Sequence, residues 1–159
     1  MSKKKLIIFI PSIEGGGVEK NLFIITNYLS REIKNIKLIT ADKIYKKRFS
    51  KSIELVYPKK NILNNSKRLK KYIVCLFLLL KILLKNNNYV VFAFQANLYC
   101  TILCKLLGVR IIVRSNSSPS GWSKNIFKKY MYYKILNIAD KVIVNSNDFK
   151  RQFKEFFSV

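Results

Sequence analysis

Short apolar runs alternate with longer segments of helical periodicity along most of the chain. Leu6–Ile10 is a continuous apolar run, and Val18, Leu22, Ile25 and Leu29 then recur at the spacing of one helix face. Further strands are predicted at residues 37–40, 53–56, 89–94, 109–114 and 141–146, and further helices at 66–85, 97–107, 122–138 and 147–157. Apolar strands that alternate with helices are typical of a parallel sheet covered on both faces.

This order of elements predicts an α/β fold, a doubly wound parallel sheet of the Rossmann-like kind. The chain has 159 residues, which is enough for one domain with a real hydrophobic core. Half of the residues are hydrophobic and a quarter are charged, a composition that excludes intrinsic disorder. We find no Pro/Gly-rich linker and no internal repeat, so the sequence indicates a single domain.

The chain is strongly basic, with 31 Lys and Arg against 8 Asp and Glu and a net charge of +23. Such a charge favours polyanionic partners: nucleic acid, anionic lipid or phosphorylated substrates. A compositional origin is the alternative, because Lys, Asn and Ile are the residues that an AT-rich genome encodes. No helix-turn-helix, zinc-finger or aromatic RNA-binding pattern is present, so no specific nucleic-acid partner is predicted.

The sequence has three cysteines and no histidine. The cysteines lack metal-ligand spacing, and Cys100 and Cys104 stand four residues apart on a predicted helix, where buried small hydrophobes are the expected reading. The apolar run before Pro11 is too short for a signal peptide. We therefore expect a reduced, cytoplasmic protein, and the missing histidine removes the commonest general base.

Gly15, Gly16 and Gly17 follow the first predicted strand and precede the first predicted helix. Ligands of open parallel sheets bind beyond the carboxyl ends of the strands, and a helix amino end favours a phosphate. Glycines there would let a ligand approach the backbone. The alternative is a tight turn in which Glu19 only complements the helix dipole. The spacing fits neither G-x-G-x-x-G nor a nucleotide P-loop.

The helix predicted at 66–85 is apolar nearly all round. We expect one broad face against the sheet, made of Leu69, Tyr72, Ile73, Leu76, Leu80, Leu83 and Leu84. The opposite side would carry Val74, Leu78 and Ile82 among Lys71, Lys81 and Lys85. The apolar run is too short to span a bilayer. A lysine-ringed apolar patch suits an anionic membrane surface, and packing against a helix or partner is the alternative.

Three segments resemble the amino-terminal domain of family-four glycosyltransferases of the GT-B fold. They are "GGGVEK" followed by "NLFIITNYL", "RSNSSPSG" after the fifth predicted strand, and "ADKVIVNSNDFKRQF" at residues 139–153. The resemblance covers essentially the whole chain. It implies that residues 1–159 form the acceptor-side domain, because the donor-binding domain with its paired glutamates, E-x₇-E, has no counterpart here. We therefore expect a fragment, a truncated product or half of a split enzyme, inactive alone.

The same resemblance implies a retaining hexosyltransferase that moves a sugar from a nucleotide-sugar to a glycan or lipid-linked acceptor in surface polysaccharide synthesis. It implies no cofactor and no metal, a separate carboxyl-terminal half as a partner, and a cytoplasmic location, with or without attachment to the inner face of the membrane. The competing hypothesis is a non-catalytic basic module that binds anionic membrane or nucleic acid.

Individual roles follow from the resemblance. Gly15, Gly16 and Gly17 would lie against the donor diphosphate, and Glu19 would orient the first helix and line the cleft. The cleft or acceptor residues would be Gln95, Asn97, Arg114, Ser115 and Asn116. Many relatives carry a histidine near Asn116, and this chain has none. Ser146 is expected to cap the helix that follows it.

Overall fold

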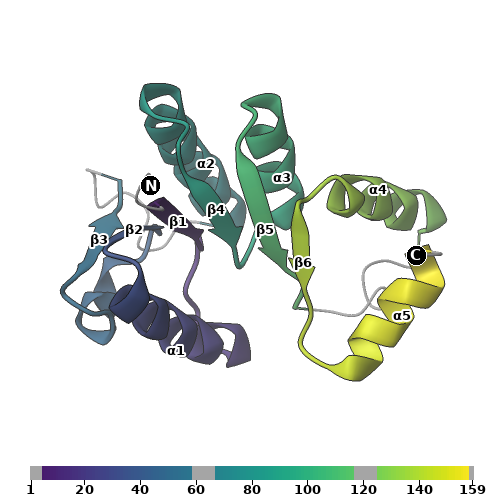
Figure 1. The fold of residues 1–159 in the computed structure, drawn as a ribbon, viewed down its shortest axis with the longest axis horizontal. Coiled ribbons are helices and arrows are strands. Elements are labelled where there is room, and N and C mark those ends of the chain that lie inside the picture. The colour runs from purple at the N-terminus through teal and green to yellow at the C-terminus, as the bar shows by residue number, and fades with distance from the viewer. Residues whose placement is uncertain (1–4, 59–66, 117–124, 158–159) are drawn as a thin grey trace.

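The structure is a computed structural model that describes residues 5–58, 67–116 and 125–157. Its centre is a six-stranded sheet in the order β3-β2-β1-β4-β5-β6 (Figure 1). Every neighbouring pair of strands is parallel. The strands are β1 (Lys5–Phe9), β2 (Asn35–Ile39), β3 (Ile53–Val56), β4 (Val90–Ala93), β5 (Arg110–Arg114) and β6 (Lys141–Ile143). The predicted doubly wound parallel sheet is confirmed.

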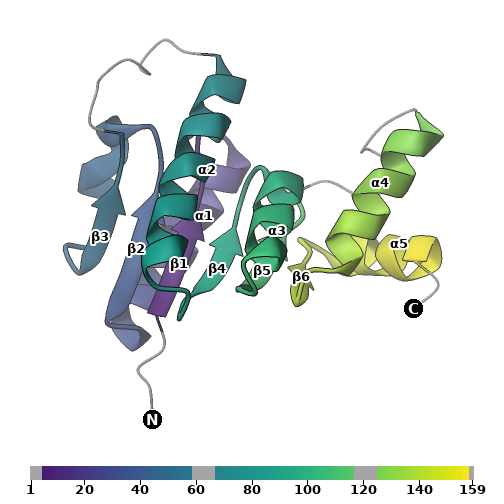
Figure 2. The ribbon, with the colours of Figure 1, turned by 90° about the horizontal axis from the view of Figure 1, so that it is seen from above.

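Helices cover both faces of this sheet. They are α1 (Gly17–Glu32), α2 (Arg68–Lys85), α3 (Asn97–Leu106), α4 (Ile126–Asn137) and α5 (Asn147–Phe157), with a short 3-10 helix η1 (Lys43–Arg48). Figures 1 and 2 show α2 and α3 side by side on one face, with α1 on the other. The outer strand β6 leads into α5, beside α4, at the far end of the sheet from β3.

The alternation of side chains along β1 explains this layering. Ile7 and Phe9 point into a core with α2 and α3, which contribute Cys75, Leu79, Leu83, Cys100 and Cys104. Ile8 belongs to a second core on the opposite face, where α1 contributes Leu22 and Phe23. Because successive residues of a strand face opposite sides, one apolar run of five residues serves both cores.

The predicted strands and helices all occur, with differences at their boundaries and one additional short helix. The strand at 141–146 is shorter than predicted and ends at Ile143, while η1 was not predicted. The start of the long helix at Ser66 and of the next-to-last helix at Trp122 lie outside the described residues. All three cysteines are buried and unbridged, as expected for small hydrophobes. In the described residues no helix is long and apolar enough to cross a bilayer.

The prediction of which side of α2 faces the sheet is wrong at most positions, although Leu83 is buried as predicted and Leu76 packs partly buried against the core. Lys71, Cys75, Leu79 and Leu83 are the buried positions, and Val74, Leu78 and Ile82 pack partly buried against the core. The exposed apolar residues are instead Leu69, Ile73, Phe77 and Leu84. The helix is apolar on nearly every side, so hydrophobic periodicity could not fix its rotation. The burial of Lys71 has a separate cause, an acidic partner beneath the helix.

Candidate functional site

The connections that leave β1 and β4 meet at the carboxyl edge of the sheet. These two strands are neighbours, yet β1 is followed by strands on one side of it and β4 by strands on the other. The crevice at such a switch point is where open α/β sheets bind ligands. A hydrogen bond joins the two connections, because the backbone N–H of Ser12 donates to Oε1 of Gln95 at 3.2 Å.

The glycine turn lies on the β1 side of this crevice. Gly15 has a φ of +87°, which only glycine adopts readily, and Gly16 is the N-cap of α1 with a φ of −88°. Glu19 is buried, and its Oε1 accepts a hydrogen bond from the backbone N–H of Glu14 at 3.4 Å. Glu19, in the first turn of α1, therefore holds the glycine turn closed.

The three glycines differ in the room that surrounds them. A Cβ atom on Gly16 would lie 3.1 Å from Oε2 of Glu19, whereas one on Gly17 would meet nothing within 4 Å. A positive φ is required at Gly15 but not at Gly16. The turn thus needs one glycine for its backbone conformation, and Gly16 is the position where added bulk would press on Glu19.

A cavity of about 270 Å³ opens beside the switch point, on the side of the sheet that α2, α3 and α4 cover. Its walls come from the start of α2, the connection from β4 to α3, the end of β5, and α4. Four of the predicted acceptor residues line it: Gln95, Asn97, Ser115 and Asn116. Arg114 and the glycine turn do not line this cavity.

Three carboxamide side chains in this wall are anchored at one end only. Gln95 accepts from Ser12 as described, Nδ2 of Asn97 donates to the carbonyl of Arg114 at 2.8 Å, and Nδ2 of Asn116 donates to the carbonyl of Phe94 at 2.7 Å. These bonds fix the orientation of each amide. The opposite ends, Nε2 of Gln95 and Oδ1 of both asparagines, are buried and have no hydrogen-bond partner among the described residues.

Unpaired buried polar atoms are uncommon in folded proteins, because each costs free energy that a hydrogen bond would recover. Here one donor and two acceptors occur together in a single cavity wall. Three tyrosines, Tyr72, Tyr99 and Tyr132, add aromatic surface to the same cavity. Neutral donors and acceptors beside aromatic rings suit a ligand that is rich in hydroxyl groups.

Arg68 and Tyr72 form the α2 side of the cavity. The Arg68 guanidinium lies 5.8 Å from the centre of the Tyr72 ring, and its Nε lies 3.5 Å from Oε1 of Glu14. Burial raises the pKa of the Tyr72 phenol, and Arg68 partly opposes this rise. Tyr72 is therefore a neutral hydroxyl at physiological pH, and Arg68 connects the cavity to the residue just before the glycine turn.

Ala96 connects the two anchored amides Gln95 and Asn97. Its φ of 53° and ψ of 34° place it in the left-handed region, and it is the N-cap of α3. Among the described residues no other non-glycine residue has a positive φ. Such a conformation costs an alanine free energy, and it is observed preferentially at functional sites.

A polar network that was not predicted from the sequence lies next to the cavity. Asp42 accepts from the backbone N–H of Ile13 at 2.8 Å and from Nζ of Lys71 at 2.7 Å. Nζ of Lys71 also lies 3.5 Å from Oγ of Ser12, which donates to Oε1 of Glu14 at 3.0 Å. Ser12 and Asp42 each follow shortly after a buried strand, which is the sequence signal that could have pointed to them.

Two further predicted residues have structural partners. Nη2 of Arg114 donates to Oδ1 of Asn145 at 2.8 Å, its guanidinium lies 5.5 Å from the centre of the Phe94 ring, and burial lowers its pKa. Arg114 thus joins the ends of β5 and β6 rather than the cavity wall. Oγ of Ser146 accepts from the backbone N–H of Phe149 at 3.2 Å, which confirms that Ser146 caps α5.

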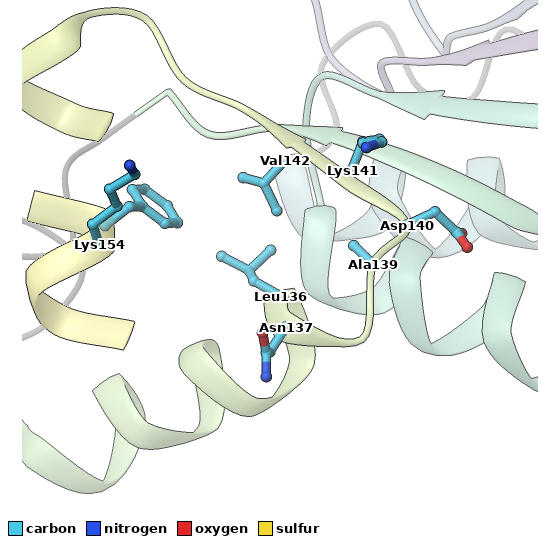
Figure 3. A pocket seen from close by; sticks show the side chains of 8 residues that line it. Leu136, Asn137, Ala139, Asp140, Lys141, Val142 and Lys154 are labelled. Carbon is cyan, nitrogen blue, oxygen red and sulfur yellow. The ribbon is translucent and has the colours of Figure 1, made fainter. Parts of the chain in front are cut away.

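A second cavity of about 290 Å³ lies between the end of α4, β6 and α5. Figure 3 shows Leu136, Val142 and Lys154 facing this space, with Ala139 and Asp140 at its rim. Asp140 is already engaged, since its Oδ2 accepts from Lys105 Nζ at 2.8 Å and from the Ile111 N–H at 2.7 Å. This mostly apolar space lies away from the switch point and offers fewer unpaired polar groups, so the carboxamide cavity is the better candidate site.

Known proteins resemble this chain in fold. No known family model matches the sequence, and no curated protein matches it. A glycosyltransferase from Rickettsia africae superposes with a TM-score of 0.68 at 21% identity, over 100% of this chain and 41% of that one. Anabaena HepE, in complex with UDP and glucose, superposes with a TM-score of 0.66 at 14% identity, over 96% of this chain and 41% of that one. UGT73P12 of Glycyrrhiza uralensis gives 0.66 at 8% identity, over 98% and 47%.

These identities are low, so the likeness shows the fold: a Rossmann-like half of the GT-B glycosyltransferase architecture. The chain spans less than half the length of each of these three structures. The Anabaena protein is also known in complex with UDP-glucose.

Proposed function

We propose that this chain is the acceptor-binding half of a retaining GT-B glycosyltransferase of the family-four type, which transfers a sugar from a nucleotide-sugar to a glycan or lipid-linked acceptor. Surface polysaccharide synthesis is the process in which we expect it to act. The donor-binding half would be supplied by further sequence or by a separate chain, and without it this chain would not catalyse transfer. Both halves would work without a metal or cofactor.

The single observation that carries this proposal is the set of unpaired carboxamide ends in the cavity wall. Nε2 of Gln95 can donate to a sugar hydroxyl, and the Oδ1 atoms of Asn97 and Asn116 can each accept from one. None of the described residues that line the cavity is an Asp, Glu or His. The cavity therefore suits binding and orientation of an acceptor, which is a large contribution to catalysis when the reactive groups come from elsewhere.

The glycine turn has a separate role in the proposal. When a donor half closes over the switch point, the diphosphate of the nucleotide-sugar would approach Gly15–Gly17 and the amino end of α1. Backbone N–H groups there would stabilise the charge that develops on the leaving phosphate. In a complete enzyme, Gly16→Val should lower turnover by about 10²–10³-fold while acceptor binding survives. Full glycosyl transfer by this variant would show that the glycines only form the turn and have no role in phosphate binding.

The acceptor site can be tested on the chain itself by NMR. Side-chain NH₂ signals of Gln95, Asn97 and Asn116 should shift on titration with soluble glycosides of hexoses and disaccharides, because these amides meet the ligand directly. Asn116→Ala should weaken this binding by about tenfold or more, the effect of one lost hydrogen bond that leaves a partner unpaired.

Asn87→Ala is the matched control, because Asn87 is an exposed carboxamide residue between α2 and β4. It should leave the titration unchanged. Shifts confined to surface amides, or equal binding by Asn116→Ala and the control, would contradict the assignment of the acceptor site. A basic module that binds nucleic acid is the less favoured alternative, since the cavity wall offers mostly neutral amides and aromatic rings.

A further inference from the structure

Helices α2 and α3 expose apolar side chains in stripes on the side away from the sheet. On α2 the stripe consists of Leu69, Ile73, Phe77 and Leu84, each more than half exposed. On α3 it consists of Tyr99, Ile102 and Leu106, of which Leu106 is 79% exposed. Spacings of three, four and seven residues place the members of each stripe on one face of their helix. We call these seven residues the α2–α3 outer face.

The two stripes form part of one surface, because α2 and α3 lie side by side on the same face of the sheet (Figures 1 and 2). Their inner sides are occupied by the core, through Cys75, Leu79 and Leu83 on α2 and Cys100 and Cys104 on α3. The stripes therefore point outward from both helices. Exposed apolar side chains gathered on one side of a domain mark a site of interaction with a protein or a membrane.

The charged residues of α2 and α3 themselves are all basic, and Glu14 and Asp140 from neighbouring segments pair with Arg68 and Lys105 on these helices. Lys70, Lys81 and Lys85 are exposed on α2, and Nζ of Lys81 lies 5.4 Å from the centre of the Phe77 ring. None of the 8 acidic residues of the chain lies between Glu54 and Asp140, a stretch that contains α2 and α3 whole. Lysine is depleted in protein–protein interfaces, and a second copy of this chain would bring lysine against lysine.

Apolar side chains interspersed with lysines are the combination that binds the surface of an anionic membrane. The apolar groups enter the boundary between headgroups and acyl chains, and the lysines meet the anionic headgroups. We propose that the α2–α3 outer face docks on an anionic lipid surface. This differs in its residues from the patch predicted from sequence, since Lys71, Val74, Leu78 and Ile82 are buried or half-buried against the core.

The docking surface adjoins the candidate acceptor site. Arg68 and Tyr72 at the start of α2 line the carboxamide cavity, as do Asn97 and Tyr99 at the start of α3. A membrane against the outer face would therefore place the cavity beside the lipid headgroups. A lipid-linked acceptor could then reach the cavity without leaving the bilayer. This last step rests on the proposed function, whereas the docking itself does not.

Sedimentation with lipid vesicles tests the docking without any glycan or nucleotide-sugar. The chain should bind vesicles of mixed phosphatidylcholine and phosphatidylglycerol and bind pure phosphatidylcholine weakly. The triple variant Ile73→Ser/Phe77→Ser/Leu84→Ser should lower the partition coefficient by at least about tenfold, because three apolar side chains no longer enter the lipid. Lys70→Ser/Lys81→Ser/Lys85→Ser should remove most of the preference for phosphatidylglycerol and most of the salt dependence.

The matched control is Ile24→Ser/Tyr28→Ser on α1, on the opposite face of the sheet. Ile24 and Tyr28 are 60% and 61% exposed, comparable with Ile73. This control should bind vesicles as the unaltered chain does, and circular dichroism should show all variants folded. Equal binding by the folded triple variant and the unaltered chain, an equal loss in the control, or an apolar-dependent dimer in place of vesicle binding would overturn the proposal. The glycoside titration above is independent of every one of these outcomes.

Discussion

Nζ of Lys71 lies 2.7 Å from Oδ1 of Asp42, beneath α2 at the carboxyl edge of the sheet. Both side chains are almost buried, with exposures of 11% and 12%. The other carboxylate oxygen of Asp42 accepts from the backbone of Ile13. The Asp42 carboxylate therefore joins α2 to the connections that follow β1 and β2. The glycine turn belongs to the first of these connections, and the start of α2 lines the cavity.

Lys71→Met should lower the free energy of unfolding by about 3 kcal/mol, because it leaves the Asp42 carboxylate nearly buried without its cation. Urea denaturation gives this value directly from the shift in midpoint. The matched control is Lys37→Met, which breaks the Lys37–Glu54 pair between β2 and β3, where Glu54 is 61% exposed. That change should cost less than about 1 kcal/mol. Equal costs for the two variants would mean that the buried pair does not hold these segments together.

The glycine turn yields a prediction in which two positions, two residues apart, change stability in opposite directions. Gly15→Ala should lower stability by about 1–2 kcal/mol, because alanine is strained at a φ of +87°. Gly17→Ala should raise it by about 0.5 kcal/mol, because its Cβ meets nothing within 4 Å and α1 gains a better helix former. Thermal unfolding of both variants is the measurement. A loss at Gly17 or a gain at Gly15 would show that the turn has another conformation in solution.

The sheet could be predicted from sequence because its central strands, β1 and β4, are buried on both faces. Runs such as Leu6–Ile10 are apolar throughout, and most predicted strands are followed by a segment of helical period. The short helix η1 could not be predicted, since Lys43–Arg48 is mostly polar and has no buried residue. The rotation of α2 about its axis could not be predicted for the opposite reason, because α2 carries apolar residues on nearly every side.

Part of the candidate site could also be predicted. Gln95, Asn97, Ser115 and Asn116 stand just beyond strands, and the structure brings all four to one cavity. The anchoring of the three carboxamides could not be foreseen, because each partner is a backbone group at or just beyond the end of another strand, 83, 17 or 22 residues away in sequence. The pairing of Lys71 with Asp42 spans 29 residues, and sequence alone shows only a lysine in an apolar helix.

Asp140 provides a prediction about pH. Its pKa is lowered from the ordinary value of 3.8, first by the hydrogen bond from Lys105 and then by that from the Ile111 backbone. A carboxyl whose folded pKa is depressed contributes stability above its unfolded pKa, and this contribution is lost as the pH falls through the folded value. The Asp140→Asn variant should therefore have a lower free energy of unfolding than the unaltered chain, by a constant amount at neutral pH. This difference in the free energy of unfolding should narrow below about pH 4.

Urea denaturation at a series of pH values measures this gap. Lys105→Met is the informative second variant, because it removes the largest cause of the lowered pKa while leaving the Ile111 bond. Its stability difference from the unaltered chain should narrow over the same acidic range. A gap for Asp140→Asn that widens as the pH falls would have the wrong sign for a depressed pKa and would contradict this account of Asp140.

Ala96 is the residue at which strain and the candidate site coincide. Ala96 has a φ of 53°. Ala96→Gly should raise the free energy of unfolding of the domain by up to about 1 kcal/mol, because glycine adopts the left-handed conformation without a clash. The control is Ala139→Gly, an alanine without a positive φ, where the same change should destabilise by about 1 kcal/mol. Urea denaturation compares the two variants directly.

The added freedom at residue 96 should act on ligand binding in the other direction. Gln95 and Asn97 flank this residue, and their amides keep one position only while the turn between them is fixed. Ala96→Gly should therefore weaken glycoside binding in the NMR titration even as the domain becomes more stable, because binding must then order the turn. An Ala96→Gly variant that is more stable and binds glycosides as tightly as the unaltered chain would show that the strain at Ala96 has no part in organising the cavity.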